Sequence, residues 1–180
     1  MSVSLWTLGH STRPIDEFIV LLRAHQISLL VDVRTVPRSR YNPQFNRGTL
    51  AQSLRDAGLQ YRHLPELGGL RKPKKDSIND GWRNTSFRGY ADYMQTEEFH
   101  SAIEALMAAG SQEKTTVMCA EAVPWRCHRS LIADALVSRG WDVRHIMSPE
   151  KATPHVLTSF AHFEKGTLTY PKPTDLPSLF

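Results

Sequence analysis

The chain has few of the features that mark secreted or membrane proteins. Only two of its 180 residues are cysteines, too few for the disulfide framework of a small secreted protein. No stretch approaches the roughly 20 apolar residues that a membrane-spanning helix needs. The opening residues, MSVSLWTLGH, lack the charged head and long apolar stretch of a secretory signal. These absences predict a cytoplasmic protein that does not cross a membrane and whose cysteines are reduced thiols.

Signs of several domains are equally scarce. The sequence contains no internal repeat, no low-complexity tract and no change in composition that would mark a boundary. Hydrophobic residues make up 41% of the chain, enough for one domain of this length to bury a sizeable core. We therefore expect residues 1–180 to form a single α/β domain.

Strand and helix patterns alternate along this chain. Apolar, β-favouring runs lie at 4–8, 28–34, 59–64, 115–120 and 141–147. Helical spacing of apolar residues lies at 11–25, 49–58, 87–110 and 129–140. The alternation predicts a three-layer sandwich with a mainly parallel central sheet flanked by helices. Residues 160–171 are predicted to form a small C-terminal hairpin around Lys165-Gly166.

Polar residues follow three of the predicted strands. Gly9-His10-Ser11 follows the first, Asp32 and Arg34 end the second, and Cys119 ends the strand TTVMC. Ligands of open α/β sheets bind beyond the carboxyl ends of the strands. If these strands are parallel and adjacent, the three clusters converge on one site.

Cys119 is the residue of this group with the most distinctive chemistry. A loop and a helix N-terminus follow it, and such surroundings stabilise a thiolate. Arg126 and Arg129 add positive charge, while Glu121 or His128 would handle protons. The simpler alternative is that Cys119 is a small core residue that closes an apolar strand.

Other residues near the strand ends each have two interpretations. His10 either exchanges protons in the crevice or bonds the backbone as a neutral imidazole. Asp32 and Arg34 lie on one face of a strand, which favours an internal ion pair. Alternatively Arg34, together with Arg38 and Tyr41, binds an anion or a base.

Two further classes of function remain open. Basic residues are concentrated in the loops 34–47 and 71–75, where a nucleic acid would bind to side chains such as Lys72, Lys74 and Lys75. A metal site would use Cys119, Cys127 and His128, with His10 as a fourth ligand. The eight-residue spacing of the cysteines is unlike that of structural zinc sites.

The order of several motifs resembles a known family. The segments TLGHST, VDVRTVPRSRYNPQFN, LQYRHLPELGG and MCAEAVPWRCHRSLIADAL are similar to the bacterial and archaeal family catalogued as domain of unknown function 488, over about residues 5–170. The resemblance implies an α/β sandwich but no established reaction. It implies a polar site built from His10, Ser11, Asp32, Arg34, Pro37, Cys119, Glu121, Cys127, His128 and Arg129.

A more distant similarity is the rhodanese-like layout of strand, cysteine loop and RS helix. Rhodaneses and cysteine phosphatases hold a thiolate in a loop of backbone amides closed by an arginine. Here six residues separate Cys119 from Arg126, the loop has no glycine, and Pro124 and Trp125 remove or crowd amides. This departure argues against phosphatase chemistry and leaves persulfide chemistry open.

The leading hypothesis is a thiol-centred site that acts on an anionic substrate by sulfur transfer or hydrolysis, as a cysteine-dependent transferase or hydrolase does. A disulfide with Cys127 would resolve an oxidised or persulfidated Cys119. The candidate catalytic residues are Cys119, Glu121, His128 and His10; the candidate substrate-binding residues are Ser11, Arg34, Arg38, Tyr41, Arg126 and Arg129; Asp32 and Cys127 are supporting residues. We expect no cofactor, and a partner that is an anionic small molecule or a nucleic acid.

Overall fold

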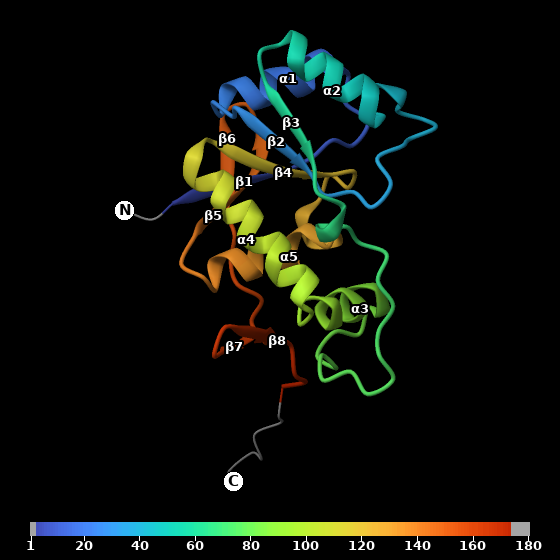
Figure 1. Ribbon diagram of the computed structural model, residues 1–180, viewed down its shortest axis with the longest axis vertical. Coiled ribbons are helices and arrows are strands. Elements are labelled where there is room, and N and C mark those ends of the chain that lie inside the picture. The colour runs from blue at the N-terminus through green and yellow to red at the C-terminus, as the bar shows by residue number, and fades with distance from the viewer. Residues whose placement is uncertain (1–2, 174–180) are drawn as a thin grey trace.

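A central six-stranded sheet and its flanking helices make up most of the computed structural model, which describes residues 3–173 (Figure 1). The strands of this sheet are β1 (Ser4–Gly9), β2 (Leu29–Asp32), β3 (Gln60–His63), β4 (Thr115–Cys119), β5 (Asp142–Ser148) and β6 (Lys151–Pro154). The helices are α1 (Ile15–Ala24), α2 (Arg47–Asp56), α3 (Thr85–Tyr93), α4 (Glu97–Gln112) and α5 (Arg129–Val137). Short 3-10 turns lie at Pro43–Phe45, Pro65–Leu67 and Pro124–Arg126.

The sheet is mainly parallel and has the order β3-β2-β4-β1-β5-β6. Every residue of β2 and β4 is buried, as expected for strands covered on both faces. Only β6 runs antiparallel, at the edge beside β5. The prediction of a mainly parallel sheet flanked by helices is confirmed. The strand β6 was not predicted, because its short, polar, proline-containing sequence is typical of a turn.

Two hydrophobic clusters cover opposite faces of the sheet, because side chains alternate along each strand. One face packs on α1 and α2 through Leu8 and Met118, among others. The other packs on α3, α4 and α5 through Val117 and Cys119. In Figure 1, α1 and α2 lie above the strands, and α3 and α5 lie below them. Neighbouring residues at a strand end are thereby directed to different sides of the sheet.

The start of the first helix differs from the sequence prediction. It begins at Ile15 after Pro14, without a side-chain cap, and not behind the predicted Ser/Thr cap. The region 87–110, for which one or two helices are predicted, contains two, because Asn84 and Thr96 each accept hydrogen bonds from backbone N–H groups of the turn that follows. The cap at Thr96 starts α4, so that α3 and α4 are two separate helices.

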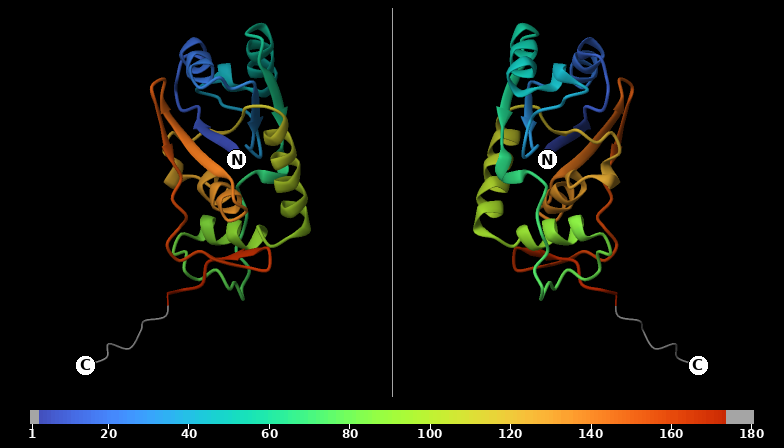
Figure 2. Two further views of the ribbon diagram at one scale, coloured as in Figure 1. Left: turned by 90° about the vertical axis from the view of Figure 1, so that its left-hand side faces the viewer. Right: turned by 90° about the vertical axis from the view of Figure 1, so that its right-hand side faces the viewer.

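The predicted C-terminal hairpin is confirmed. It consists of β7 (His162–Glu164) and β8 (Thr167–Thr169). The turn residues Lys165 and Gly166 have φ values of 50° and 81°, which suit a two-residue hairpin turn. Figure 2 shows the hairpin beyond the end of the main sheet, beside α3.

Two broader predictions concern membrane-spanning helices and the extent of the domain. Among residues 3–173, no helix is both long and apolar enough to cross a bilayer. The predicted domain 1–180 includes residues 1–2 and 174–180, which lie outside the described residues.

Candidate functional site

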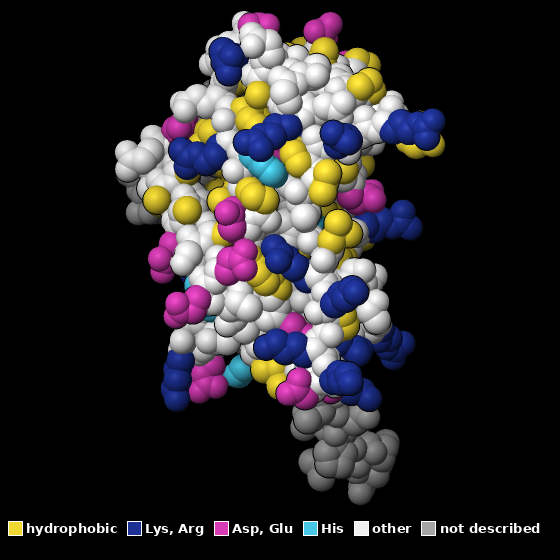
Figure 3. All heavy atoms as spheres, turned by 45° about the vertical axis from the view of Figure 1, so that its right-hand side comes forward, with side chains coloured by type: hydrophobic (Ala, Val, Ile, Leu, Met, Phe, Trp, Pro, Cys, Tyr) yellow, Lys and Arg dark blue, Asp and Glu magenta, His cyan; other side chains and the backbone are white. Residues whose placement is uncertain are grey.

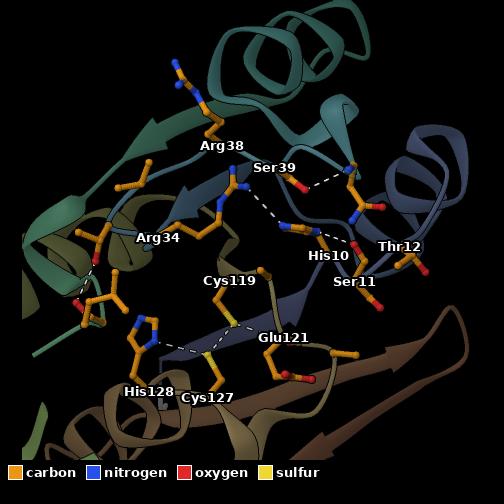
Figure 4. Close-up of a pocket in the computed structure, with 17 residues that line it drawn as sticks. His10, Ser11, Thr12, Arg34, Arg38, Ser39, Cys119, Glu121, Cys127 and His128 are labelled. Carbon is orange, nitrogen blue, oxygen red and sulfur yellow. Dashed lines mark hydrogen bonds between the residues drawn. The ribbon is translucent and has the colours of Figure 1, made fainter. Parts of the chain in front are cut away.

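The three polar strand ends converge, because β4 lies between β2 and β1. Backbone hydrogen bonds continue the pairing past the strands: the N–H of His10 donates to the carbonyl of Cys119 at 2.9 Å, and that of Ser11 to Ala120 at 2.9 Å. A cavity of about 610 Å³ opens at this edge (Figure 4). Predicted site residues that line it are His10, Ser11, Arg34, Arg38, Cys119, Glu121, Cys127 and His128.

A glycine at the end of β1 makes this convergence sterically feasible. A Cβ at Gly9 would collide with the backbone carbonyl of Glu121. The loop that follows β4 therefore passes directly against β1. This close approach holds the loop, and with it the second cysteine, over the strand end.

The two cysteines face each other at the floor of the cavity. Their Sγ atoms are 2.7 Å apart, and both are free thiols. The hydrogen bond from Cys127 lowers the pKa of Cys119, against the opposing effect of burial. The same hydrogen bond raises the pKa of Cys127 well above its ordinary value, and burial adds to this rise. The opposite shifts make Cys119 the more acidic thiol of the pair.

Arg129 is a buried cation behind the thiols. It is 1% exposed, and its Nη2 donates to the carbonyls of Glu121 and Ala122 at 3.3 Å each. Its Nε and Nη1 have no hydrogen-bond partner among the described residues, and no described carboxylate forms an ion pair with it. A buried charge without a partner is costly. The positive charge of Arg129 is one cause that lowers the pKa of Cys119.

His128 connects the thiol pair to the backbone of β2. Its Nε2 lies 3.2 Å from the carbonyl of Val33, and its Nδ1 lies 3.5 Å from Sγ of Cys127. Burial is the main cause that lowers the pKa of His128 to about 4. A neutral ring that donates from Nε2 leaves the Nδ1 lone pair directed at Cys127. Because the pKa of Cys127 lies far above that of His128, this contact orients the thiol and does not deprotonate it.

His10 is also neutral and is fixed in one orientation. Its Nδ1 lies 2.7 Å from the carbonyl of Ser11, and Nη1 of Arg34 lies 3.3 Å from its Nε2. The ring stacks on Phe45, with centroids 4.2 Å apart. Burial, followed by the charge of Arg34, lowers the pKa of His10 to about 4. The donor arrangement assigns the proton to Nδ1 and makes Nε2 the acceptor.

Arg34 forms the internal ion pair that its strand position suggested. Its Nε and Nη2 donate to the two carboxylate oxygens of Asp32 at 2.9 and 2.7 Å. The hydroxyl of Tyr61 donates to the same carboxylate at 2.7 Å. Arg34 nevertheless lines the cavity, so the structural and anion-binding interpretations are compatible. The pair holds the guanidinium rigid at the wall.

The remaining predicted residues are more dispersed. Arg38 and Glu121 are exposed at the rim of the cavity. Tyr41 is 88% exposed, Arg126 is exposed, and neither lines the cavity. The N-terminal N–H of α5, from Arg129, lies 3.5 Å from Sγ of Cys127 rather than Cys119. The helix terminus therefore contacts the second cysteine of the pair.

The sequence reasoning missed two contributors. Arg13 donates to the carbonyls of Gly9 and His10, and burial and the charge of Arg129 lower its pKa. It was hidden inside a predicted helix that starts later. Leu70 is 88% exposed at the cavity mouth with a φ of 62°, a conformation that is rare for a leucine. No sequence signal distinguished it.

The metal alternative lacks a ligand set in residues 3–173. No three His, Cys, Asp or Glu side chains there are arranged to hold a metal ion.

Comparison with known proteins identifies one family. No curated protein and no solved structure matches the chain. The model of the family described as Domain of unknown function DUF488 matches residues 14–136, a shorter range than the predicted 5–170. The matched range includes both cysteines and Arg34 but not His10. Because it covers more than half of the chain, the protein belongs to the DUF488 family.

Proposed function

We propose that Cys119 is the nucleophile of a sulfur-transfer reaction and that Cys127 resolves the product. The main support for this proposal is the Sγ–Sγ distance of 2.7 Å between Cys119 and Cys127, together with the opposite pKa shifts of the two thiols. A low-pKa thiolate attacks, and a neighbouring thiol of higher pKa completes the exchange. This is a cysteine-dependent transferase that acts on an anionic sulfur donor.

The first step is a displacement at the donor. The Cys119 thiolate attacks the outer sulfur atom of the donor and forms a new S–S bond. The bond between that sulfur and the rest of the donor breaks, and the leaving group departs as an anion with the bonding electron pair. Thiosulfate, whose leaving group is sulfite, is a donor of this class. The product is a persulfide on Cys119.

The second step uses the neighbouring thiol. The Cys127 thiol attacks Sγ of Cys119 and forms a Cys119–Cys127 disulfide. Its proton passes to the departing outer sulfur, which leaves as hydrosulfide. Two thiol sulfurs are oxidised, and the transferred sulfur is reduced. An external dithiol then reduces the disulfide and restores the site.

Anion binding is assigned to the wall opposite the sulfurs. Arg34 is held at this wall by Asp32, and Arg38 is exposed at the rim. Ser11, which lines the same cavity, supplies a hydroxyl donor. Its φ of 51° is an uncommon conformation of the kind that collects at functional sites. These groups suit a small anion next to the thiolate.

Hydrolysis receives less support from the same geometry. A covalent intermediate on Cys119 would need a base that activates water. The acceptor atom of His10 is occupied by Arg34, and that of His128 faces Cys127. The nearest nucleophile to an intermediate on Cys119 is the second thiol. Resolution by Cys127 is therefore the favoured outcome.

The proposal is tested by trapping the persulfide. The reduced protein is incubated with thiosulfate and analysed by peptide mass spectrometry. We expect Cys127→Ser to accumulate one added sulfur on Cys119, because no thiol remains to resolve it. The wild-type protein should yield the Cys119–Cys127 disulfide and release hydrosulfide.

Reactivity of the thiol is measured separately with iodoacetamide across a range of pH. We expect Cys119 to react faster than a model thiol near neutral pH, and Cys119→Ser to lose both this labelling and the persulfide. Labelling of Cys119 no faster than the model thiol would remove the nucleophile from the proposal. Fast labelling without any added sulfur would remove sulfur transfer alone.

A further inference from the structure

A second concave region lies at the edge of the sheet, between α2 and the edge strand β3. It has a volume of about 760 Å³. Its charged lining consists of Arg47, Arg55, Arg62 and His63, and no acidic residue lines it. The three arginines are exposed. We refer to this region as the edge groove.

The arginines of the edge groove are free of internal ion pairs. None of them forms a salt bridge with a described acidic residue, and the one side-chain hydrogen bond involving them joins Arg55 to the neutral amide of Gln52. Exposed arginines on a protein surface commonly face carboxylates. Here three guanidinium groups are available to an external anion.

Spacing on α2 suits an anion with more than one charged group. Arg47, Ala51 and Arg55 follow one another at intervals of four residues, which places them along one face of the helix. Eight residues at the rise of an α-helix separate the backbones of the two arginines by about 12 Å. Extended along the helix face, their side chains can contact separate phosphates of one strand. The small side chain of Ala51 leaves the space between them open.

Aromatic side chains complete the lining. Tyr61 lines the edge groove, while its hydroxyl is held by Asp32 at 2.7 Å. His63 is likewise fixed, with Nε2 2.8 Å from the carbonyl of Arg34. Fixed aromatic rings beside a positive groove are the features by which proteins bind unpaired bases and their phosphates. A small phosphate compound would use the charges but not the rings.

The charge distribution of the whole chain supports a polyanion. Residues 34–75 hold 10 of the 22 Lys and Arg but only 2 of the 18 Asp and Glu. The remaining residues, with 12 basic and 16 acidic side chains, are net negative. In the upper part of Figure 3, several Lys and Arg side chains surround one histidine. The positive charge is thus concentrated in the part of the sequence that contains the three arginines of the edge groove.

We propose that the edge groove binds the phosphate backbone of a single-stranded nucleic acid. The arginines contact successive phosphates, and the rings of Tyr61 and His63 contact bases. This binding site is separate from the proposed thiol chemistry. It also differs from the loop 71–75, whose lysines do not line the groove.

The test measures binding of the full-length protein to fluorescein-labelled oligonucleotides about 12 nucleotides long, by fluorescence anisotropy at several salt concentrations. Single-stranded RNA, single-stranded DNA and duplex DNA are the three probes. The groove variant is Arg47→Gln, Arg55→Gln, Arg62→Gln. The matched control is Lys72→Gln, Lys74→Gln, Lys75→Gln, which removes the same charge outside the groove. Thermal unfolding of both variants checks that they fold.

We expect the wild-type protein to bind a single-stranded probe in a salt-dependent way. The groove variant should bind it at least about tenfold more weakly, with a log–log salt slope smaller by about 2, because about 0.7 is lost for each phosphate contact. The lysine control should retain most of the affinity. A higher affinity for the RNA or for the DNA probe shows which of these two nucleic acids the edge groove prefers.

Equal weakening of both triple variants, salt-independent binding, absence of binding, or stronger binding to the duplex would overturn the proposal. The measurement needs no reaction at Cys119. Failure here therefore leaves the persulfide experiment unaffected, and failure of that experiment leaves the groove result unaffected.

Discussion

At the scale of single residues, the buried charge of Arg129 connects stability with reactivity. Its guanidinium has two unpartnered nitrogens and no carboxylate partner among the described residues. Such a group is unfavourable for folding unless it has a counterion. We propose that the thiolate of Cys119 fills this role, since the charge of Arg129 lowers the pKa of that thiol. Arg129 is thus better explained by the chemistry of the thiol than by packing.

Replacement of this arginine separates the two effects. In Arg129→Met, the free energy of unfolding should fall by about 3–5 kcal/mol, because one partner of a buried charge pair and two hydrogen bonds to carbonyls are lost. Iodoacetamide labelling of Cys119 at neutral pH should become slower, because a cause of its lowered pKa is removed. Chemical denaturation and labelling kinetics measure the two quantities.

Arg126→Met is the matched control in the same loop. Arg126 is exposed and does not line the cavity, so its loss should leave both quantities unchanged. Unaltered labelling of Cys119 in Arg129→Met would contradict the assignment of the thiolate as its counterion.

The candidate site could be predicted from residue types and strand ends, but its electrostatic pairing could not. The convergence of His10, Arg34 and Cys119 follows from parallel, adjacent strands. Sequence spacing does not say that Cys127 turns back onto Cys119, because this depends on the path of the loop. Sequence spacing also does not predict that Arg129 is buried while Arg126 is exposed.

At the scale of elements, strong apolar periodicity predicted the strands and helices, while ends and edges depended on local contacts. The buried strands β2 and β4 were recognisable from their apolar runs. The edge strand β6 is held by pairing with β5, a tertiary contact that leaves little trace in a short polar sequence. The helices that start at Ile15 and Thr85 follow Pro14 and Asn84. The periodicity of apolar residues contains no information on these flanking residues.

The contact between β1 and the cysteine loop gives a prediction at the same scale. Gly9→Ala places a methyl group against the carbonyl of Glu121, and the loop must shift to accept it. We expect a loss of about 1–3 kcal/mol in the free energy of unfolding, the usual cost of overpacking. Because the shifted loop carries Cys127, labelling of Cys119 should also change.

Gly48→Ala is the control, with an effect of opposite sign. Gly48 lies in α2 with nothing within 4 Å of an added Cβ. Alanine should therefore stabilise the protein by roughly 0.5–1 kcal/mol. Denaturation curves of the two variants side by side test the contact, and a neutral Gly9→Ala would argue against a tight loop.

At the scale of the whole molecule, buried neutral histidines lie on both sides of the sheet. His10 and His128 belong to the cavity, and burial lowers the pKa of each to about 4. Burial also lowers the pKa of His145 to about 4, and its Nε2 lies 2.9 Å from His155 in a chain of hydrogen bonds that ends at Asp134. Three buried histidines in two parts of the molecule thus disfavour the imidazolium form.

Acid should therefore destabilise the fold well before carboxylates are protonated. The three folded-state pKa values of about 4 lie below the ordinary value of 6.5, so unfolding takes up protons between these pH values. The free energy of unfolding is fully retained above pH 6.5. Below it, each histidine removes up to about 1.4 kcal/mol per pH unit until its folded pKa is reached. Urea denaturation of the reduced protein from pH 8 to pH 4 measures this slope.

Two histidine variants test the cause. His10→Asn should make the decline of the free energy of unfolding shallower by one proton, whereas His162→Asn, at an exposed position in the hairpin, should leave it unchanged. A stability that is constant between pH 7 and pH 5 would contradict the neutral, buried state of these rings.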